Sequence, residues 1–89
     1  MKIFKMTLKT TDTQVLQMPK GAKVLSLQVQ HGKPQLWVLV NENTSTMTQR
    51  KFVTHGTGNP INPAVDPSKF VGTYQLDGGN QVFHVFEQI

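Results

Sequence analysis

Residues 22–40 read AKVLSLQVQHGKPQLWVLV, and this stretch decides the fold class. In its first half Leu25, Leu27 and Val29 alternate with polar residues, as in a half-buried β-strand, so we expect these three side chains to point inward. The GKP sequence that follows predicts a turn. Residues 35–40 are apolar on both faces, which predicts a central strand or one covered on both sides. Because the two runs are so close in sequence, we expect an antiparallel hairpin.

Strand patterns also dominate the rest of the chain. They predict five further strands, at residues 2–9, 14–18, 46–54, 70–76 and 81–88. The DGGN sequence before the last strand is typical of a hairpin turn, and Asp66 followed by Pro67 predicts a single helical turn capped by Asp66. No segment of helical length has a 3.6-residue apolar period. We therefore predict one all-β domain over residues 1–89, a small seven-stranded, mostly antiparallel sandwich or partly open barrel.

Length and composition narrow the class of protein. A chain of 89 residues buries a small core, so we expect a homo-oligomer in which a second subunit completes the fold. The absence of cysteine excludes disulfides, thiolate nucleophiles and cysteine-based zinc sites. No apolar segment reaches the length of a signal peptide core or a membrane span. We accordingly expect a cytoplasmic protein that has no membrane partner.

The formal net charge is +4, and it is unevenly distributed along the chain. Six of the eight lysines precede residue 34, where Asp12 is the only acidic residue. Such an excess favours anionic partners such as nucleotides, RNA or DNA. Scattered surface lysines also serve solubility, and the sequence leaves both readings open.

The segment HGTGNPINP at residues 55–63 interrupts the strand pattern and is the best candidate for a binding site. Its glycines permit positive φ, so its backbone N–H groups could form a concave anion nest, although a tight crossover would also require glycine. We place Arg50 on the exposed face of the preceding strand, as a bidentate phosphate partner. The predicted ligand-binding residues are Arg50, Lys51, Thr54, His55, Gly56, Thr57, Gly58 and Asn59.

Motifs for catalysis or metal binding are not found. No serine lies in a Gly-x-Ser-x-Gly elbow, the chain has only five acidic residues, and the glycine segment is neither a Walker nor a dinucleotide motif. His31, His55 and His84 share no short ligand spacing, and His84 is predicted to be a packed or hydrogen-bonded strand residue. Trp37 and Tyr74 fit a core or a subunit interface, with stacking on a ligand as the alternative. We predict no catalytic residue, no metal site and no cofactor.

Five segments of the sequence resemble a family of small proteins of unknown function encoded by phages and bacteria. The matching segments are LQMPKGAKVL (16–25), VQHGKPQLWVLV (29–40), HGTGNPI (55–61), VGTYQL (71–76) and VFHVFE (82–87). The resemblance covers nearly the whole chain and implies a phage or prophage accessory protein, located in the host cytoplasm if phage-encoded. It implies no particular activity.

Three functional hypotheses follow from these observations. The first is a non-enzymatic binding protein that sequesters an anionic nucleotide-type signal of antiphage defence. The second is a protein–protein module that docks on a host or virion protein by strand addition, with an uncharged apolar patch around residues 36–40. The third is a nucleic-acid-binding accessory protein, which would bind with a steep salt dependence.

Overall fold

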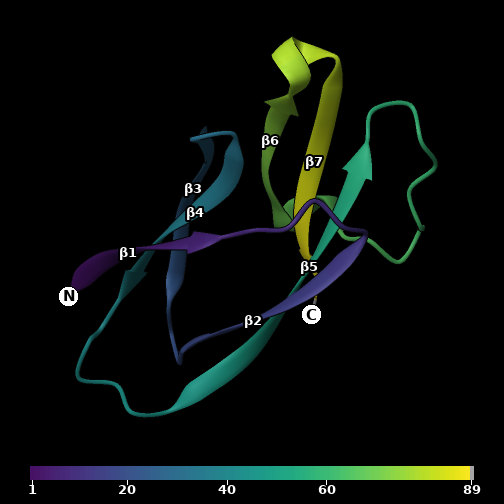
Figure 1. The fold of residues 1–89 in the computed structure, drawn as a ribbon. Helices are drawn as coiled ribbons and strands as arrows, with labels where there is room; N and C mark the ends of the chain where they lie inside the picture. The colour runs from purple at the N-terminus through teal and green to yellow at the C-terminus, as the bar shows by residue number, and fades with distance from the viewer. Residues whose placement is uncertain (89) are drawn as a thin grey trace.

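The computed structural model describes residues 1–88, and the C-terminal Ile89 lies outside the described residues. Within this range the chain is all-β, as the sequence predicts, with seven strands and two short 3-10 turns (Figure 1). The elements are β1 (Lys2–Thr7), β2 (Thr13–Pro19), β3 (Lys23–Gln30), β4 (Lys33–Val40), β5 (Met47–Gly56), η1 (Pro67–Lys69), β6 (Phe70–Leu76), η2 (Asp77–Gly79) and β7 (Gln81–Gln88). No helix in residues 1–88 is long and apolar enough to cross a membrane.

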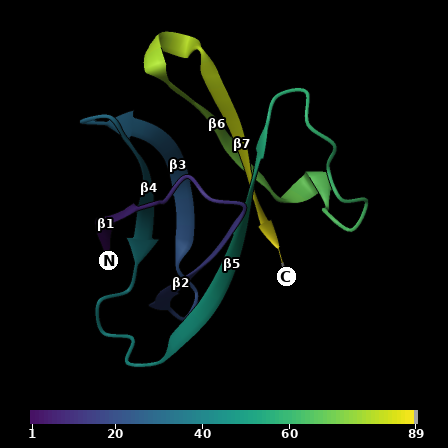
Figure 2. The same cartoon turned by 45° about the vertical axis from the view of Figure 1, so that its right-hand side comes forward.

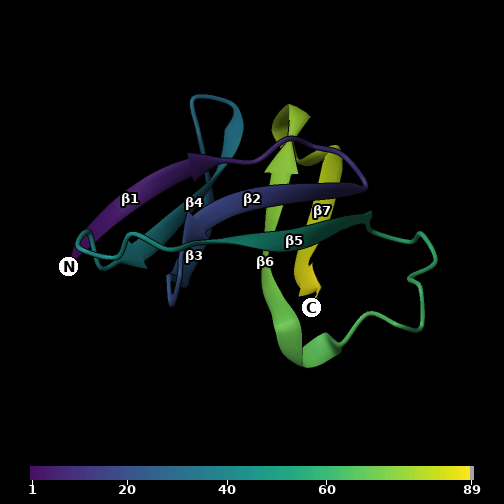
Figure 3. The same cartoon turned by 90° about the horizontal axis from the view of Figure 1, so that it is seen from below.

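The strands form two antiparallel sheets that face each other in a sandwich-like arrangement. The three-stranded sheet has the order β1-β4-β3, and the four-stranded sheet has the order β2-β5-β7-β6. Figure 3 shows the long strands β2 and β5 running side by side. The sheets approach closely where β3 meets β6, since a Cβ built on Gly72 would lie 3.1 Å from Cβ of Leu27. The two sheets do not close into a barrel.

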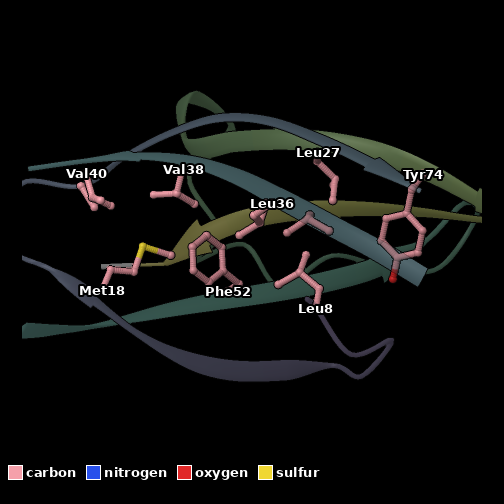
Figure 4. Packing of buried hydrophobic residues seen from close by; sticks show 10 residues of the cluster. Leu8, Met18, Leu27, Leu36, Val38, Val40, Phe52 and Tyr74 are labelled. Atoms are coloured by element: carbon pink, nitrogen blue, oxygen red, sulfur yellow. The ribbon is translucent and has the colours of Figure 1, made fainter. Parts of the chain in front are cut away.

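The core fills the space between the two sheets (Figure 4). Its largest fully buried side chains are Phe52, Met18, Leu36, Val38 and Val85, which come from both sheets. At one end, the Tyr74 hydroxyl makes a 2.9 Å hydrogen bond with the Thr10 hydroxyl, and the residue is only 3% exposed. Tyr74 is therefore a core residue, and it is not available to stack on a ligand.

The predicted hairpins form, and β4 is the central strand of its sheet as expected. The helical turn at η1 is also confirmed, because the Asp66 carboxylate caps it by accepting a hydrogen bond from the Ser68 amide. The turn between β3 and β4 is His31 and Gly32, both with positive φ, whereas the GKP sequence had predicted it one residue later. A two-residue turn in which both residues have positive φ has a backbone twist that matches the twist of the flanking strands.

The expected inward position of Leu25 is wrong. Its strand pairs Val24 with Val38 but Ser26 with Trp37, so Leu25 occupies a β-bulge. A bulge inserts one extra residue and leaves it unpaired. Leu25 is consequently 44% exposed, whereas Leu27, after the bulge, is buried in the core. Val29 lies on the same face of β3 as Leu27, but it is 38% exposed because it is near the end of the hairpin.

Candidate functional site

A cleft with a volume of about 500 Å³ lies beside the C-terminal half of β5. One wall is the outer face of the four-stranded sheet, and the other is the segment that follows β5. Figure 2 shows that this segment extends away from the three-stranded sheet before it reaches η1. Five of the eight predicted binding residues line this β5 cleft: Lys51, Thr54, His55, Gly56 and Asn59.

The glycine segment folds back on β5 through its own hydrogen bonds. The Asn59 amide donates to the Gly56 carbonyl at 3.1 Å, and Gly58 adopts a φ of +87° that favours glycine. Gly56 is needed for a different reason, because a Cβ there would lie 2.9 Å from Nδ2 of Asn59. The Thr57 amide donates to the Val82 carbonyl. Two of the amides expected to form an anion nest are thus already bonded within the protein.

Thr57 and Gly58 do not line the cleft, and Thr57 instead anchors the segment to β7. Its hydroxyl lies 2.6 Å from Nε2 of His84, while the Thr73 hydroxyl lies 2.8 Å from Nδ1 of the same ring. A neutral imidazole offers one donor and one acceptor, so the two threonines satisfy both of its nitrogens. His84 is therefore a hydrogen-bonded strand residue, as predicted.

His55 is the cross-strand partner of His84 but lies in a different environment. Its ring packs edge-on against Phe86, with a centroid distance of 6.2 Å. The Nε2 atom is buried and has no hydrogen-bond partner among residues 1–88. Buried polar groups are almost always satisfied, so this unpaired nitrogen on the wall of the cleft is a candidate contact point for a bound molecule.

Thr54 carries the second unpaired polar atom. Its hydroxyl is buried without a partner in the described part of the chain, and the residue is 7% exposed. The Thr54 amide donates to the Asp12 carbonyl at 3.0 Å, which fixes Asp12 beside β5. Asp12, Thr54 and Asn59 also line a smaller cavity of about 140 Å³. Two unsatisfied groups from successive residues thus concentrate at this end of β5.

The prediction that Arg50 lies on the exposed face is wrong. Arg50 lies on the same face of β5 as Phe52, which is fully buried, and the Arg50 side chain is only 20% exposed. Its Nε and Nη2 bind the two carboxylate oxygens of Glu87 at 2.6 and 2.8 Å, and Nη1 donates to the Ala22 carbonyl. The bond with Glu87 holds the pKa of Arg50 above its usual value. Arg50 therefore links β7 to the turn that precedes β3, and it is absent from the cleft lining.

Lys51 has the opposite parity and is the one predicted cation that lines the cleft. Several further lining residues are not among the predicted ones: Asn62 and Val65 belong to the same loop, whereas Asp12, Thr13 and Gln88 come from distant segments. Pairing of β2 with β5 places Thr13 opposite Val53, and pairing of β5 with β7 places Gln88 opposite Lys51. No local pattern indicates these pairings. Within residues 1–88, no group of three or more His, Asp or Glu side chains is placed to hold a metal ion.

Comparison with known protein families gives one match, over residues 1–89, to a domain of unknown function, DUF7352. The chain belongs to this family. No curated protein and no solved structure gives a significant match to the chain. Membership in this family agrees with the resemblance to an uncharacterised family, and it assigns no function to the chain.

Proposed function

We propose that the protein is a non-enzymatic binding protein that sequesters a small anionic ligand of nucleotide type in the β5 cleft. The observation that carries this proposal is the buried, unpartnered Nε2 of His55 on the same strand face as Lys51. A volume of about 500 Å³ lies within the range of small-molecule sites. A phage or prophage accessory role, directed against a nucleotide signal of host defence in the cytoplasm, is part of the same proposal.

The spacing of the polar groups suits a molecule with a charged end and a hydrogen-bonding end. Lys51 and His55 are four residues apart on one strand, which separates them by roughly 13 Å. Lys51 would bind the anionic group, and Val53 between them would support an apolar ring. The carboxylate of Asp12, which also lines the cleft, would repel a ligand that is negatively charged throughout. The same carboxylate can accept a hydrogen bond from an amino group of a base.

A mass-spectrometric capture experiment tests the proposal first. The purified protein is incubated with a nucleotide-rich lysate of phage-infected cells, washed and heat-denatured, and the released small molecules are identified. We expect one discrete nucleotide. A defined panel of cyclic and linear nucleotides is then screened by thermal unfolding, where a ligand at about 100 times its Kd stabilises by roughly 2.7 kcal/mol. Release of no discrete nucleotide, together with no shift from the panel, would refute the proposal.

Matched variants then locate the site. The double variant Lys51→Ala with His55→Ala is expected to lose the thermal shift, because it removes both ends of the proposed contact. Lys20→Ala is the control, since it removes one charge from an exposed residue that does not line the cleft. Equal shifts for the double variant and the control would place the ligand elsewhere.

A second candidate function, docking on a host or virion protein, is favoured by the free edge of β1. Within residues 1–88 this strand pairs only with β4, and the exposed fractions of Met1, Ile3 and Phe4 are 74, 60 and 49%. An unpaired edge with apolar side chains can accept a strand from another chain, including a second copy of this protein. In this case the capture experiment would yield a polypeptide and no nucleotide.

A further inference from the structure

The net charge of the protein resides on the three-stranded sheet. Strands β1, β3 and β4 contain four lysines and no acidic residue. The rest of the chain contains five basic and five acidic residues, which balance. The distribution therefore gives this sheet the whole formal charge of +4 and leaves the remainder, including the β5 cleft, neutral on average.

Three of these lysines share the outer face of the sheet with Trp37. The strand registers pair Lys5 with Trp37, Lys23 with Leu39, and Lys33 with Gln30. Trp37 is flanked in sequence by Leu36 and Val38, which are fully buried, so the indole belongs to the opposite, outer face. We call this surface the lysine face, defined by Lys5, Lys23, Lys33 and Trp37.

Hydrogen-bonding groups occupy the positions between the lysines. Ser26 pairs with Trp37, and the exposed Gln28 pairs with Gln35, which is buried and accepts a hydrogen bond from the Thr7 hydroxyl. Nζ of Lys5 lies 5.8 Å from the centre of the Trp37 ring and donates to Oε1 of Gln30 at 2.8 Å. On this face Trp37 therefore has Lys5 as a cross-strand neighbour, and Leu39 lies between Lys23 and Ile3, in contrast to the uncharged patch expected around residues 36–40.

We propose that the lysine face binds single-stranded nucleic acid. Lysines can neutralise the phosphates, the indole can stack on a base, and the exposed Gln28 amide and the Ser26 hydroxyl can bond base edges, which is how β-sheets bind unpaired strands. In duplex DNA the bases are paired and stacked, so the indole could not stack on a base and the lysine contacts would act alone. A second copy of the protein stacked on this face would bring lysines against lysines. The proposal is independent of the β5 cleft, which lies on the other sheet.

Fluorescence anisotropy with a labelled single-stranded oligonucleotide of about twelve nucleotides tests this proposal. We expect binding at low salt, with a slope of about −2 in log affinity against log salt, because three phosphate contacts each contribute about −0.7. The triple variant Lys5→Gln, Lys23→Gln, Lys33→Gln should bind at least tenfold more weakly and lose most of the slope. The matched control, Lys9→Gln with Lys20→Gln and Lys69→Gln, has the same net charge and should bind within about threefold of the wild type.

Trp37→Leu separates stacking from charge. It should weaken binding roughly tenfold without changing the salt slope, after circular dichroism has shown that the variant is folded. Equal weakening by the two triple variants would overturn the proposal, because it would indicate binding to net charge alone. Absence of binding at low salt, equal affinity for duplex DNA, or a dimer in sedimentation that Trp37→Leu dissociates would also overturn it. Lys51→Ala should leave this binding unchanged, which keeps the test separate from that of the cleft.

Discussion

Replacement of Arg50 by alanine distinguishes a structural role from a ligand-binding role for this residue. The substitution removes two charge-assisted hydrogen bonds to Glu87 and one bond to the Ala22 carbonyl. It also leaves the Glu87 carboxylate, whose side chain is 20% exposed, without its cation. Exposed ion pairs contribute about 0–1 kcal/mol, and breaking a fully buried pair costs about 3–5 kcal/mol. For a pair one-fifth exposed, we discount the buried value for solvent screening and expect a loss of about 2 kcal/mol.

Urea unfolding followed by the fluorescence of Trp37, the only tryptophan, measures this loss. The denaturant midpoint should fall with the slope m unchanged, and the thermal midpoint should fall by about 10 °C, as expected for a domain of this size. Lys51→Ala is the matched control, because Lys51 is adjacent to Arg50 in the sequence but its side chain lies on the opposite face of β5. This substitution should change the free energy of unfolding by less than about 0.5 kcal/mol. A stability loss below 0.5 kcal/mol for Arg50→Ala, combined with loss of cleft-ligand binding, would refute the structural role.

Two further predictions concern the interior. Gly72→Ala should destabilise by about 1 kcal/mol in urea unfolding, because its Cβ would meet Cβ of Leu27 at 3.1 Å, an atom that cannot move aside as a side-chain tip could. The same substitution in a Leu27→Gly background, which lacks that Cβ, should cost nothing; a cost that persists there would contradict the clash. Burial raises the pKa of Tyr74, and the hydrogen bond with Thr10 opposes this effect by a smaller amount. The stability that this shift contributes is therefore complete below the ordinary tyrosine pKa. It is lost as the pH rises through the raised pKa of the folded state. Unfolding free energies between about pH 8 and about pH 11 should therefore fall more steeply in the wild type than in Tyr74→Phe, and equal slopes would disprove the assignment.

The candidate site was predictable only in part. His55 and Lys51 could be selected because a glycine-rich interruption follows them directly in the sequence. The prediction for Arg50 gives the wrong face, because a charged residue is expected at the surface. Period-2 alternation from the apolar Phe52 instead indicates the inner side. Its buried position depends on Glu87, which is 37 residues away and becomes its partner only when β5 pairs with β7.

The sequence by itself determined the strands, the hairpins and the all-β class, because alternation and turn chemistry act over a few neighbouring residues. Only the tertiary structure decided how these strands combine into two sheets. The bulge at Leu25 reverses the alternation in the middle of a strand, and a one-residue shift exchanges the two faces. The lysine face likewise forms from three strands whose lysines are distant in the chain. Local preferences fix where a strand begins and ends, whereas the faces that meet depend on long-range pairing.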